Sequence, residues 1–226
     1  MNRRHGRKPA ARDVLLNSNH LLGAVRSQQA ALRAMGVDPA PALLESIAAY
    51  IELLLRWNRR LNLTAITDPR EIVTRNFAES FLATRWLPAD SGRLCDVGSG
   101  AGFPGLALKL VLPRWHVTLL EPTAKKAAFL AEAARTLRVR DVEVACCRWE
   151  ESKLPPGSTD AITSRALGGY GELAEWAAGR LAPAGKLILW LGARDADALR
   201  TESAWLWEHT EVPGSRERVL LVGTRP

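Results

Sequence analysis

Hydrophobic residues in the first 90 positions recur every three to four residues, which is the period of a helix that buries one face. This pattern predicts three helices, near residues 21–36, 40–60 and 68–87. An Asp-Pro pair at 68–69 is typical of the first turn of a helix, and Pro88 ends the third one. We therefore expect a helical cap over residues 21–90. The apolar stripe of its second helix consists of Leu43, Leu44, Ile47, Ile51, Leu54 and Leu55.

The pattern changes after Ser91-Gly92, where short apolar runs begin to alternate with helical periods. The predicted strands lie near 93–97, 116–121, 142–146, 160–164, 186–191, 203–210 and 217–223, and the predicted helices near 104–111, 124–137 and 169–181. Strands that alternate with helices form a mostly parallel sheet with right-handed crossovers. The turn at 212–215 predicts a hairpin that places one antiparallel strand at an edge. Residues 91–226 are thus expected to form one α/β unit with a seven-stranded Rossmann-like sheet.

Basic residues outnumber acidic ones by 31 to 24, and the net charge of +7 favours an anionic partner such as a nucleic acid. A first cluster of basic residues lies within residues 1–20. These residues lack an apolar period and are expected to form a flexible arm. A second basic stretch extends from Arg56 to Arg75. A disordered tail and a solvated helix face explain these charges as well, and an Arg-rich start also occurs in mitochondrial presequences.

Cysteine content and hydropathy limit the class of protein further. The chain has an odd number of cysteines, namely Cys95, Cys146 and Cys147. The adjacent pair cannot form a disulfide without strain, which indicates a reducing compartment such as the cytoplasm. The sequence has no pair of cysteines or cluster of histidines at ligand spacing, so we expect no metal. No apolar stretch approaches the ~20 residues that cross a bilayer, so we expect a soluble protein without a membrane partner.

A glycine loop from Asp96 to Gly105 directly follows the first predicted strand. Its glycines allow a tight turn and a close approach of the backbone to a ligand, and the next helix offers free amides. In a methyltransferase, Gly98, Ser99 and Gly100 would meet the amino-acid portion of S-adenosylmethionine, and Asp96 would help to accept its ammonium group. Glu121, at the end of the second strand, would accept the ribose hydroxyls.

Other interpretations of this loop have to be weighed. NAD enzymes share the carboxylate after the second strand, but their glycines follow Gly-x-Gly-x-x-Gly, whereas this loop has Gly-x-Gly-x-Gly after an acidic residue. A tight turn without a ligand would also require glycines. The combination of the loop with Asp96 before it and Glu121 after it favours the methyltransferase cofactor.

Two further positions follow strands and would face the same ligand, because open parallel sheets bind ligands beyond the carboxyl ends of their strands. After the third strand, Trp149 would flank the adenine and Glu150 would receive its exocyclic amine. After the fourth strand, Arg165 would face the reaction centre and bind a phosphate or the cofactor carboxylate. A packed tryptophan and a surface salt bridge are the alternatives without function.

The residues after the fourth strand also bear on the chemistry. Amine N-methyltransferases usually carry Asp or Asn before Pro-Pro there, whereas this chain has Ser164-Arg165-Ala166. The thiol nucleophile of cytosine C5 enzymes is not supported either, because Cys146 and Cys147 lie at the third predicted strand, in an apolar segment that would raise the pKa of a thiol. A nucleophile with an available lone pair, such as guanine N7, needs no general base, and a site of this kind would act by orientation and exclusion of water.

A series of motifs resembles, in order and spacing, the bacterial RsmG family, also called GidB or glucose-inhibited division protein B. The resemblance covers roughly residues 40–225 and is more specific than any one motif. The series consists of Trp57-Asn58, Asn62-Leu63-Thr64, Asp68-Pro69, Glu79-Ser80, the loop from Asp96 to Gly105, Lys125-Lys126, Phe129-Leu130, Glu150 and Ser164-Arg165-Ala166.

The resemblance implies a class I methyltransferase fold and transfer of a methyl group from S-adenosylmethionine to N7 of a guanine in 16S ribosomal RNA. The partner would be this RNA or the 30S subunit, and we expect a cytoplasmic monomer. The cofactor contacts implied by the resemblance are Gly98, Phe103, Trp149, Glu150 and Arg165, the last also in a catalytic position. The candidate RNA-binding residues are Arg59, Arg60, Arg75, Lys125 and Lys126.

Three positions depart from the family pattern. The family commonly has His where Asn76 stands, Lys where Leu191 precedes a glycine, and Lys where Gly223 lies. Fewer basic groups on the substrate side would weaken RNA binding or change the substrate. Two other classes of function therefore remain open: an RNA-binding or ribosome-assembly factor without catalysis, and a methyltransferase of small molecules.

Overall fold

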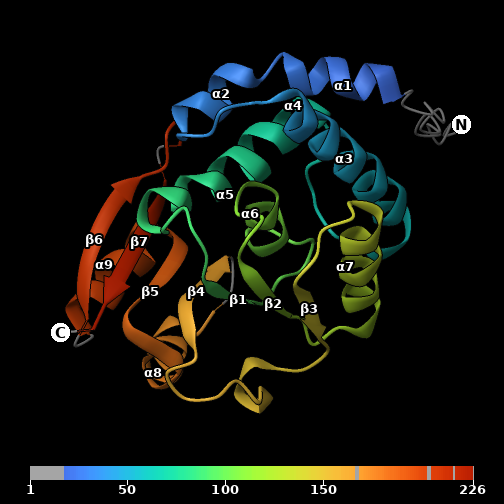
Figure 1. Ribbon diagram of the computed structural model, residues 1–226. Coiled ribbons are helices and arrows are strands. Elements are labelled where there is room, and N and C mark those ends of the chain that lie inside the picture. The colour runs from blue at the N-terminus through green and yellow to red at the C-terminus, as the bar shows by residue number, and fades with distance from the viewer. Residues whose placement is uncertain (1–17, 166–167, 203–204, 216, 226) are drawn as a thin grey trace, which may run out of the picture.

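The computed structural model describes residues 18–165, 168–202, 205–215 and 217–225, and its strands form one seven-stranded sheet (Figure 1). The strands are β1 (Arg93–Val97), β2 (His116–Leu120), β3 (Val142–Ala145), β4 (Thr159–Arg165), β5 (Leu181–Gly192), β6 (Leu206–Glu211) and β7 (Arg218–Thr224). Their order in the sheet is β3-β2-β1-β4-β5-β7-β6. Within this sheet β7 runs in the direction opposite to that of the other six strands. The predicted mostly parallel seven-stranded sheet is confirmed.

The position of the antiparallel strand was predicted incorrectly. The hairpin exists, but β7 is inserted between β5 and β6, and β6 forms the edge. The amino-acid sequences of β6 and β7 explain why β6 is the edge strand. From Val219 to Val222 every residue of β7 is apolar and buried, as a strand covered on both faces requires, whereas β6 is mostly polar and exposed. A polar strand is the one that tolerates the edge.

The helical cap precedes the sheet. The first predicted helix is divided into α1 (Ser18–Arg26) and α2 (Gln29–Ala34), and the second is α3 (Pro41–Leu61). The third is one helical segment that changes its pitch, through α4 (Pro69–Ile72), the π-helix η1 (Val73–Ala78), α5 (Glu79–Phe81) and the 3-10 helix η2 (Leu82–Trp86). The predicted cap at Asp68 is confirmed, because its side chain accepts hydrogen bonds from the amides of Arg70 and Glu71.

The remaining helices connect the strands. They are α6 (Gly105–Val111), α7 (Ala124–Thr136), the 3-10 helix η3 (Trp149–Glu151), α8 (Tyr170–Arg180) and α9 (Ala193–Glu202). Helix α9 was not predicted, because Ala196 and Leu199 are its only buried apolar residues and they form no visible period. The start of β5 was also missed, since Pro183 and Gly185 resemble a turn and in fact lie where the register of β4 and β5 shifts.

Two hydrophobic clusters lie on opposite faces of the sheet. The larger one joins the cap helices, α6 and α7 to residues such as Leu94 of β1 and Ile188 of β5. The smaller one joins α8 and α9 to the alternate residues of the same strands, among them Cys95 and Leu187. Figure 1 shows α3 and α5 beside α6 and α7, while α8 and α9 lie apart near β5 to β7. The cap therefore shares its core with the sheet.

Most of the predicted arm lies outside the described residues, as does Ala166 of the motif after β4. The last three residues of the predicted arm, 18–20, form the first turn of α1. Among the described residues, no helix has both the length and the apolar character needed to cross a membrane.

Candidate functional site

The carboxyl ends of β1, β2 and β4 meet at one edge of the sheet, and the glycine loop lies there. The amides of Gly98 and Ser99 both donate hydrogen bonds to the carbonyl oxygen of Leu120, over 2.9 and 3.0 Å. The Ser164 hydroxyl donates to the Val97 carbonyl over 3.0 Å. These bonds join three neighbouring strand ends and hold the backbone of the loop in a defined position.

Glu121 supports the same loop from the end of β2. One of its carboxylate oxygens accepts the amide of Gly100 over 3.0 Å, and the other accepts the amide of Thr123 over 2.8 Å. The side chain is buried, so a contact with ribose hydroxyls would use the remaining lone pairs of these oxygens. The structure thus gives Glu121 a role in loop geometry that the sequence did not indicate.

Asp96 lies beneath the loop and is fully buried. One carboxylate oxygen accepts the hydroxyl of Thr163 over 2.8 Å, and the other, within the described residues, has no hydrogen-bond partner and faces the backbone of Gly105. Burial raises the pKa of Asp96 to about 6, against the lowering effect of the Thr163 hydrogen bond. The predicted contact with a cofactor ammonium stays a prediction, and the carboxylate as placed here faces the protein interior.

Tyr50 of α3 holds the loop from the cap side, a role that the sequence analysis missed. Its hydroxyl donates a hydrogen bond of 2.8 Å to the carbonyl oxygen of Ala101, and its ring stacks on Phe103 with 5.4 Å between centroids. The Phe103 ring also meets Phe77 edge to face at 5.0 Å. The structure therefore places the ring of Phe103 in the core, and not at the surface of the loop. The available signal was the spacing of Tyr50, three residues after the stripe residue Ile47.

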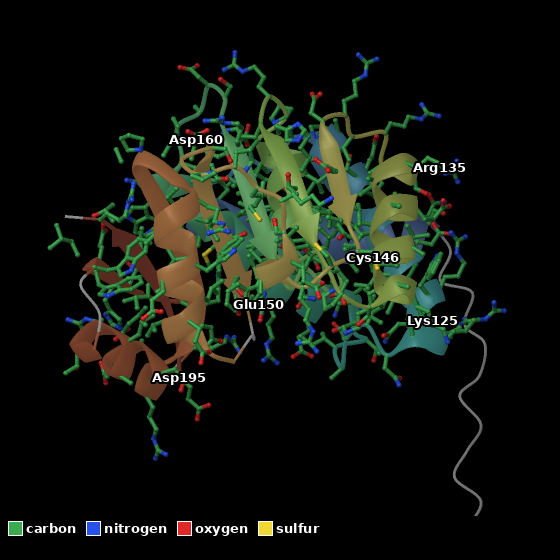
Figure 2. The ribbon with its side chains drawn as sticks, turned by 90° about the horizontal axis from the view of Figure 1, so that it is seen from below. Lys125, Arg135, Cys146, Glu150, Asp160 and Asp195 are labelled. Atoms are coloured by element: carbon green, nitrogen blue, oxygen red, sulfur yellow. The ribbon has the colours of Figure 1, made fainter. Side chains whose placement is uncertain are left out.

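Trp149 and Glu150 follow β3 in the short helix η3. Figure 2 shows Glu150 at the same edge of the molecule as Lys125, opposite to Asp160 at the start of β4. Trp149 is half-buried and meets Trp176 of α8 edge to face at 5.5 Å, while Glu150 is exposed. Both predicted adenine contacts therefore lie at the edge where the strands end, and Trp149 is oriented by its packing.

Arg165, at the end of β4, binds Glu79 of the cap over 3.2 Å. Arg218, at the start of β7, binds the other oxygen of the same carboxylate over 2.6 Å. The Glu79 side chain is only 4% exposed, against 17% for Arg165 and 29% for Arg218. Burial raises the pKa of Glu79, and the two guanidinium groups act in the opposite direction. The Glu79 backbone also accepts the indole N–H of Trp190 over 3.0 Å, which fixes α5 against β5.

The five predicted RNA-binding residues do not form one continuous cluster. Lys125 and Lys126 begin α7, and Arg59 and Arg60 end α3, where they line a cavity of about 420 Å³ with Trp57. Arg75 lies apart from these four, in η1, one turn before Glu79. It pairs with Glu71 over 2.7 Å and lines a different cavity together with Glu79 and Arg218.

The three departures from the family pattern lie in packed surroundings. Asn76 is buried within η1, and Leu191 belongs to the smaller hydrophobic cluster. Gly223 lies beneath Trp207 and Trp205, whose rings stack at 5.5 Å, and a Cβ atom at this position would collide with Trp207. The tryptophans of this chain therefore exclude a side chain at residue 223.

The loop has the features that a bound S-adenosylmethionine would require. A Cβ atom on Gly100 would have only the Gly98 carbonyl oxygen nearby, at 3.8 Å, so the outer face of the loop is open. Gly98 and Gly100 have φ angles of 72° and 52°, which favour glycine. Arg165 retains one guanidinium nitrogen without a partner in the described part of the chain. No group of three potential metal-binding side chains was found there.

Known proteins show the same fold. A SAM-dependent methyltransferase from Aquifex aeolicus superposes with a TM-score of 0.59 at 16% identity, covering 72% of this chain and 96% of that chain. Geranyl diphosphate C-methyltransferase from Streptomyces coelicolor, solved with S-adenosyl-L-homocysteine, gives a TM-score of 0.55 at 14% identity over 66% of this chain and 78% of that one. At such identities the likeness establishes the class I methyltransferase fold alone.

Proteins found by their sequences are more similar to this chain. The chain is 43% identical over 192 residues to ribosomal RNA small subunit methyltransferase G of Roseiflexus castenholzii, covering 79% of this chain and 82% of the relative. The corresponding protein of Halorhodospira halophila is 41% identical over 160 residues, or 71% and 74% of the two chains. A family model described as rRNA small subunit methyltransferase G matches residues 43–216. The chain therefore belongs to the rRNA small subunit methyltransferase G family, a family of S-adenosylmethionine-dependent methyltransferases.

Proposed function

We propose that this protein transfers the methyl group of S-adenosylmethionine to N7 of a guanine in the 16S RNA of the small ribosomal subunit. The observation that carries this proposal is the joining of the glycine loop, Glu121 and Arg165 at one edge of a methyltransferase sheet. Membership of the family, over residues 43–216, supports the ribosomal substrate. Such a substrate agrees with a protein that acts in the cytoplasm.

The residues at this edge would hold the cofactor as follows. The open backbone from Gly98 to Gly100 receives its amino-acid portion, and Glu121 receives its ribose. Trp149 and Glu150 receive its adenine. The free guanidinium nitrogen of Arg165 receives its carboxylate, since a planar guanidinium binds carboxylates well.

The bound cofactor would supply an electrophilic methyl group, and the chain would supply orientation. Guanine N7 has an available lone pair, so no side chain has to remove a proton before the methyl group is transferred. Holding the nucleophile in line with the methyl group and excluding water would account for catalysis. Arg165 is the charged group at the end of β4, where the two substrates would meet, and its ion pair with Glu79 fixes its orientation.

The basic groups at the strand-end edge would bind the RNA. Lys125 lies there next to the loop that follows β2, and Arg75 lies on the cap side near Glu79. Arg59 and Arg60 extend the basic surface at the end of α3. Contacts with phosphates would give affinity, while the folded RNA would provide the shape that selects one guanine.

The test is incorporation of labelled methyl groups from S-adenosylmethionine into 30S subunits that lack guanine-N7 methylation. We expect label at a single guanine, mapped by borohydride and aniline cleavage, and a loss of at least tenfold in rate for Arg165→Ala. Arg135→Ala is the matched control, because Arg135 is exposed at the opposite edge of the molecule (Figure 2). Cofactor binding without any transfer would instead favour a factor that binds RNA and does not methylate it.

A further inference from the structure

The connection between β3 and β4, residues 146–158, contains both residues that are proposed to hold the adenine of the cofactor. Trp149 and Glu150 lie there in the three-residue helix η3. The hydrogen bond that caps this turn is local, because the amide of Arg148 donates to the Glu151 carboxylate over 3.2 Å. Such a bond closes the turn but does not fix it against the sheet. The position of Glu150 therefore depends on other contacts.

Trp149 ties this turn to α8. Its ring meets the ring of Trp176 edge to face, with 5.5 Å between the centroids and 70° between the planes. Trp149 is half-buried, whereas the other two residues of η3, Glu150 and Glu151, are exposed. Since Trp149 is the residue of η3 that is withdrawn from solvent, its contact with Trp176 determines where the backbone of η3 and the side chain of Glu150 lie.

Trp176 is itself fixed in the core. It is buried and belongs to the smaller hydrophobic cluster. Arg180, one turn further along α8, places its guanidinium carbon 5.1 Å from the centre of the Trp176 ring, which is a cation–π contact. Within the described residues the indole nitrogen of Trp176 has no hydrogen-bond partner, so Trp176 holds Trp149 through ring contacts. A phenyl ring at this position could make the same kind of contact.

We propose that Trp176 is a positioning residue for the adenine of the cofactor, on which it acts through Trp149. Trp176 orients the ring of Trp149 and thereby holds Glu150 beside the exocyclic amine. Arg180 keeps the ring of Trp176 in place. This inference rests on the proposed placement of the adenine at Trp149 and Glu150, and it adds α8 to the elements on which cofactor affinity depends.

The test is binding of S-adenosyl-L-homocysteine to the full chain and its variants, measured by calorimetry, because this needs neither RNA nor methyl transfer. Trp176→Leu should raise the dissociation constant about tenfold, as expected for the loss of one aromatic pair. Trp176→Phe should stay within about twofold of the original protein, because it retains an aromatic ring. Arg180→Gln leaves the hydrophobic packing intact and should raise the constant about threefold.

Trp205→Leu is the matched control, with an expected change of less than about twofold. Trp205 packs against the same hydrophobic cluster, but it stacks on Trp207 of β6, and β6 and β3 lie at opposite ends of the sheet. An unchanged constant in Trp176→Leu would overturn the proposal. If Trp176→Leu does not fold, an unchanged constant in Arg180→Gln would overturn it.

A double variant distinguishes positioning from a general loss of stability. If Trp176 acts through Trp149, the variant with both Trp149→Leu and Trp176→Leu should bind no more weakly than Trp149→Leu alone. Losses that simply add would overturn the proposal. An unchanged constant in Trp149→Leu would overturn the proposed placement of the adenine as well, so the two failures can be told apart.

A truncated ligand locates the effect within the cofactor. 5′-Deoxy-5′-methylthioadenosine has the adenine and the ribose of the cofactor but lacks its amino-acid portion. Trp176→Leu should weaken the binding of this ligand by the same factor as the binding of S-adenosyl-L-homocysteine. A loss that occurs only with S-adenosyl-L-homocysteine would place the effect at the glycine loop and overturn the proposal.

Discussion

The glycine loop and the cluster of Glu79, Arg165 and Arg218 lie at the same edge of the sheet but are built in different ways. The loop is held mainly by hydrogen bonds that involve its backbone atoms, from the ends of β2 and β4 and from Tyr50 of the cap. The cluster joins Glu79 to residues 86 and 139 positions further along the chain, through ion pairs between side chains. A loop held through its backbone tolerates many changes of side chain. A cluster of three charges depends on each of them.

Both regions contain a buried carboxylate, and the partners of these two groups differ. Asp96 beneath the loop accepts the hydroxyl of Thr163, and burial raises its pKa to about 6. Glu79 has two guanidinium partners that oppose the effect of burial on its pKa. Burial raises the pKa of both groups: Asp96 gains a proton as the pH falls through about 6, whereas the two arginines limit the rise in the pKa of Glu79. The following predictions test this difference.

The largest effect is expected for Glu79→Ala. This change leaves Arg165 and Arg218 mostly buried without their shared partner, and removing one side of a buried ion pair costs about 3–5 kcal/mol. The free energy of unfolding in urea should fall by about this amount. Glu71→Ala is the matched control, since its ion pair with Arg75 is only half-buried and should contribute less than about 1 kcal/mol. Equal losses in the two variants would show that the cluster does not stabilise the fold.

The second prediction concerns Asp96 and pH. Its pKa is about 6 in the folded protein and roughly 3.9 in an unfolded chain, so the folded state binds more protons between these values. The stability that comes from this proton is therefore present below about pH 4 and is lost as pH rises through 6. At about 1.4 kcal/mol for each pKa unit, the loss amounts to about 3 kcal/mol.

Asp96→Asn tests this prediction, because an amide stays neutral and can still accept the Thr163 hydroxyl. Between about pH 4 and about pH 7, the unfolding free energy of the variant should rise by about 2 kcal/mol relative to that of the original protein, which is most of the full effect. Measuring both proteins in urea at the two pH values removes the contribution of all other groups. A difference that does not change with pH would mean that folding leaves the pKa of Asp96 unchanged.

The same contrast explains which parts of the site the sequence revealed. The glycine loop, Glu121 and the position of Arg165 after β4 are local patterns, and the parallel sheet follows from alternating strands and helices. The partners of Arg165 could not be predicted in this way. Glu79 was noticed only as part of a motif, and nothing in the sequence around Arg218 indicates that it shares a carboxylate with a residue 139 positions away.

The errors in the fold have a related cause. Helix α9 buries little apolar surface, so its pattern could not be distinguished from that of a polar loop. The order of β6 and β7 depends on which strand has two apolar faces, and the hairpin turn alone does not specify this. The π-helix η1, which contains Arg75 and directly precedes Glu79, is likewise not visible as a period. Local patterns predict elements, and tertiary packing decides their order and pitch.

The smallest predicted effect joins the two regions, because Tyr50 connects the cap to the loop. Burial raises the pKa of Tyr50 well above its usual value, so its hydroxyl keeps its proton and remains a donor to the Ala101 carbonyl. Tyr50→Phe removes this bond and retains the stacking on Phe103, at a cost of about 1 kcal/mol in unfolding free energy. A positioning role predicts in addition that the dissociation constant of S-adenosylmethionine rises about threefold to tenfold, measured by calorimetry.

Tyr170→Phe in α8, on the other face of the sheet, should leave that constant unchanged. A loss of stability without weaker cofactor binding would reduce Tyr50 to a packing residue, and the loop would then keep its shape through Leu120 and Glu121 alone.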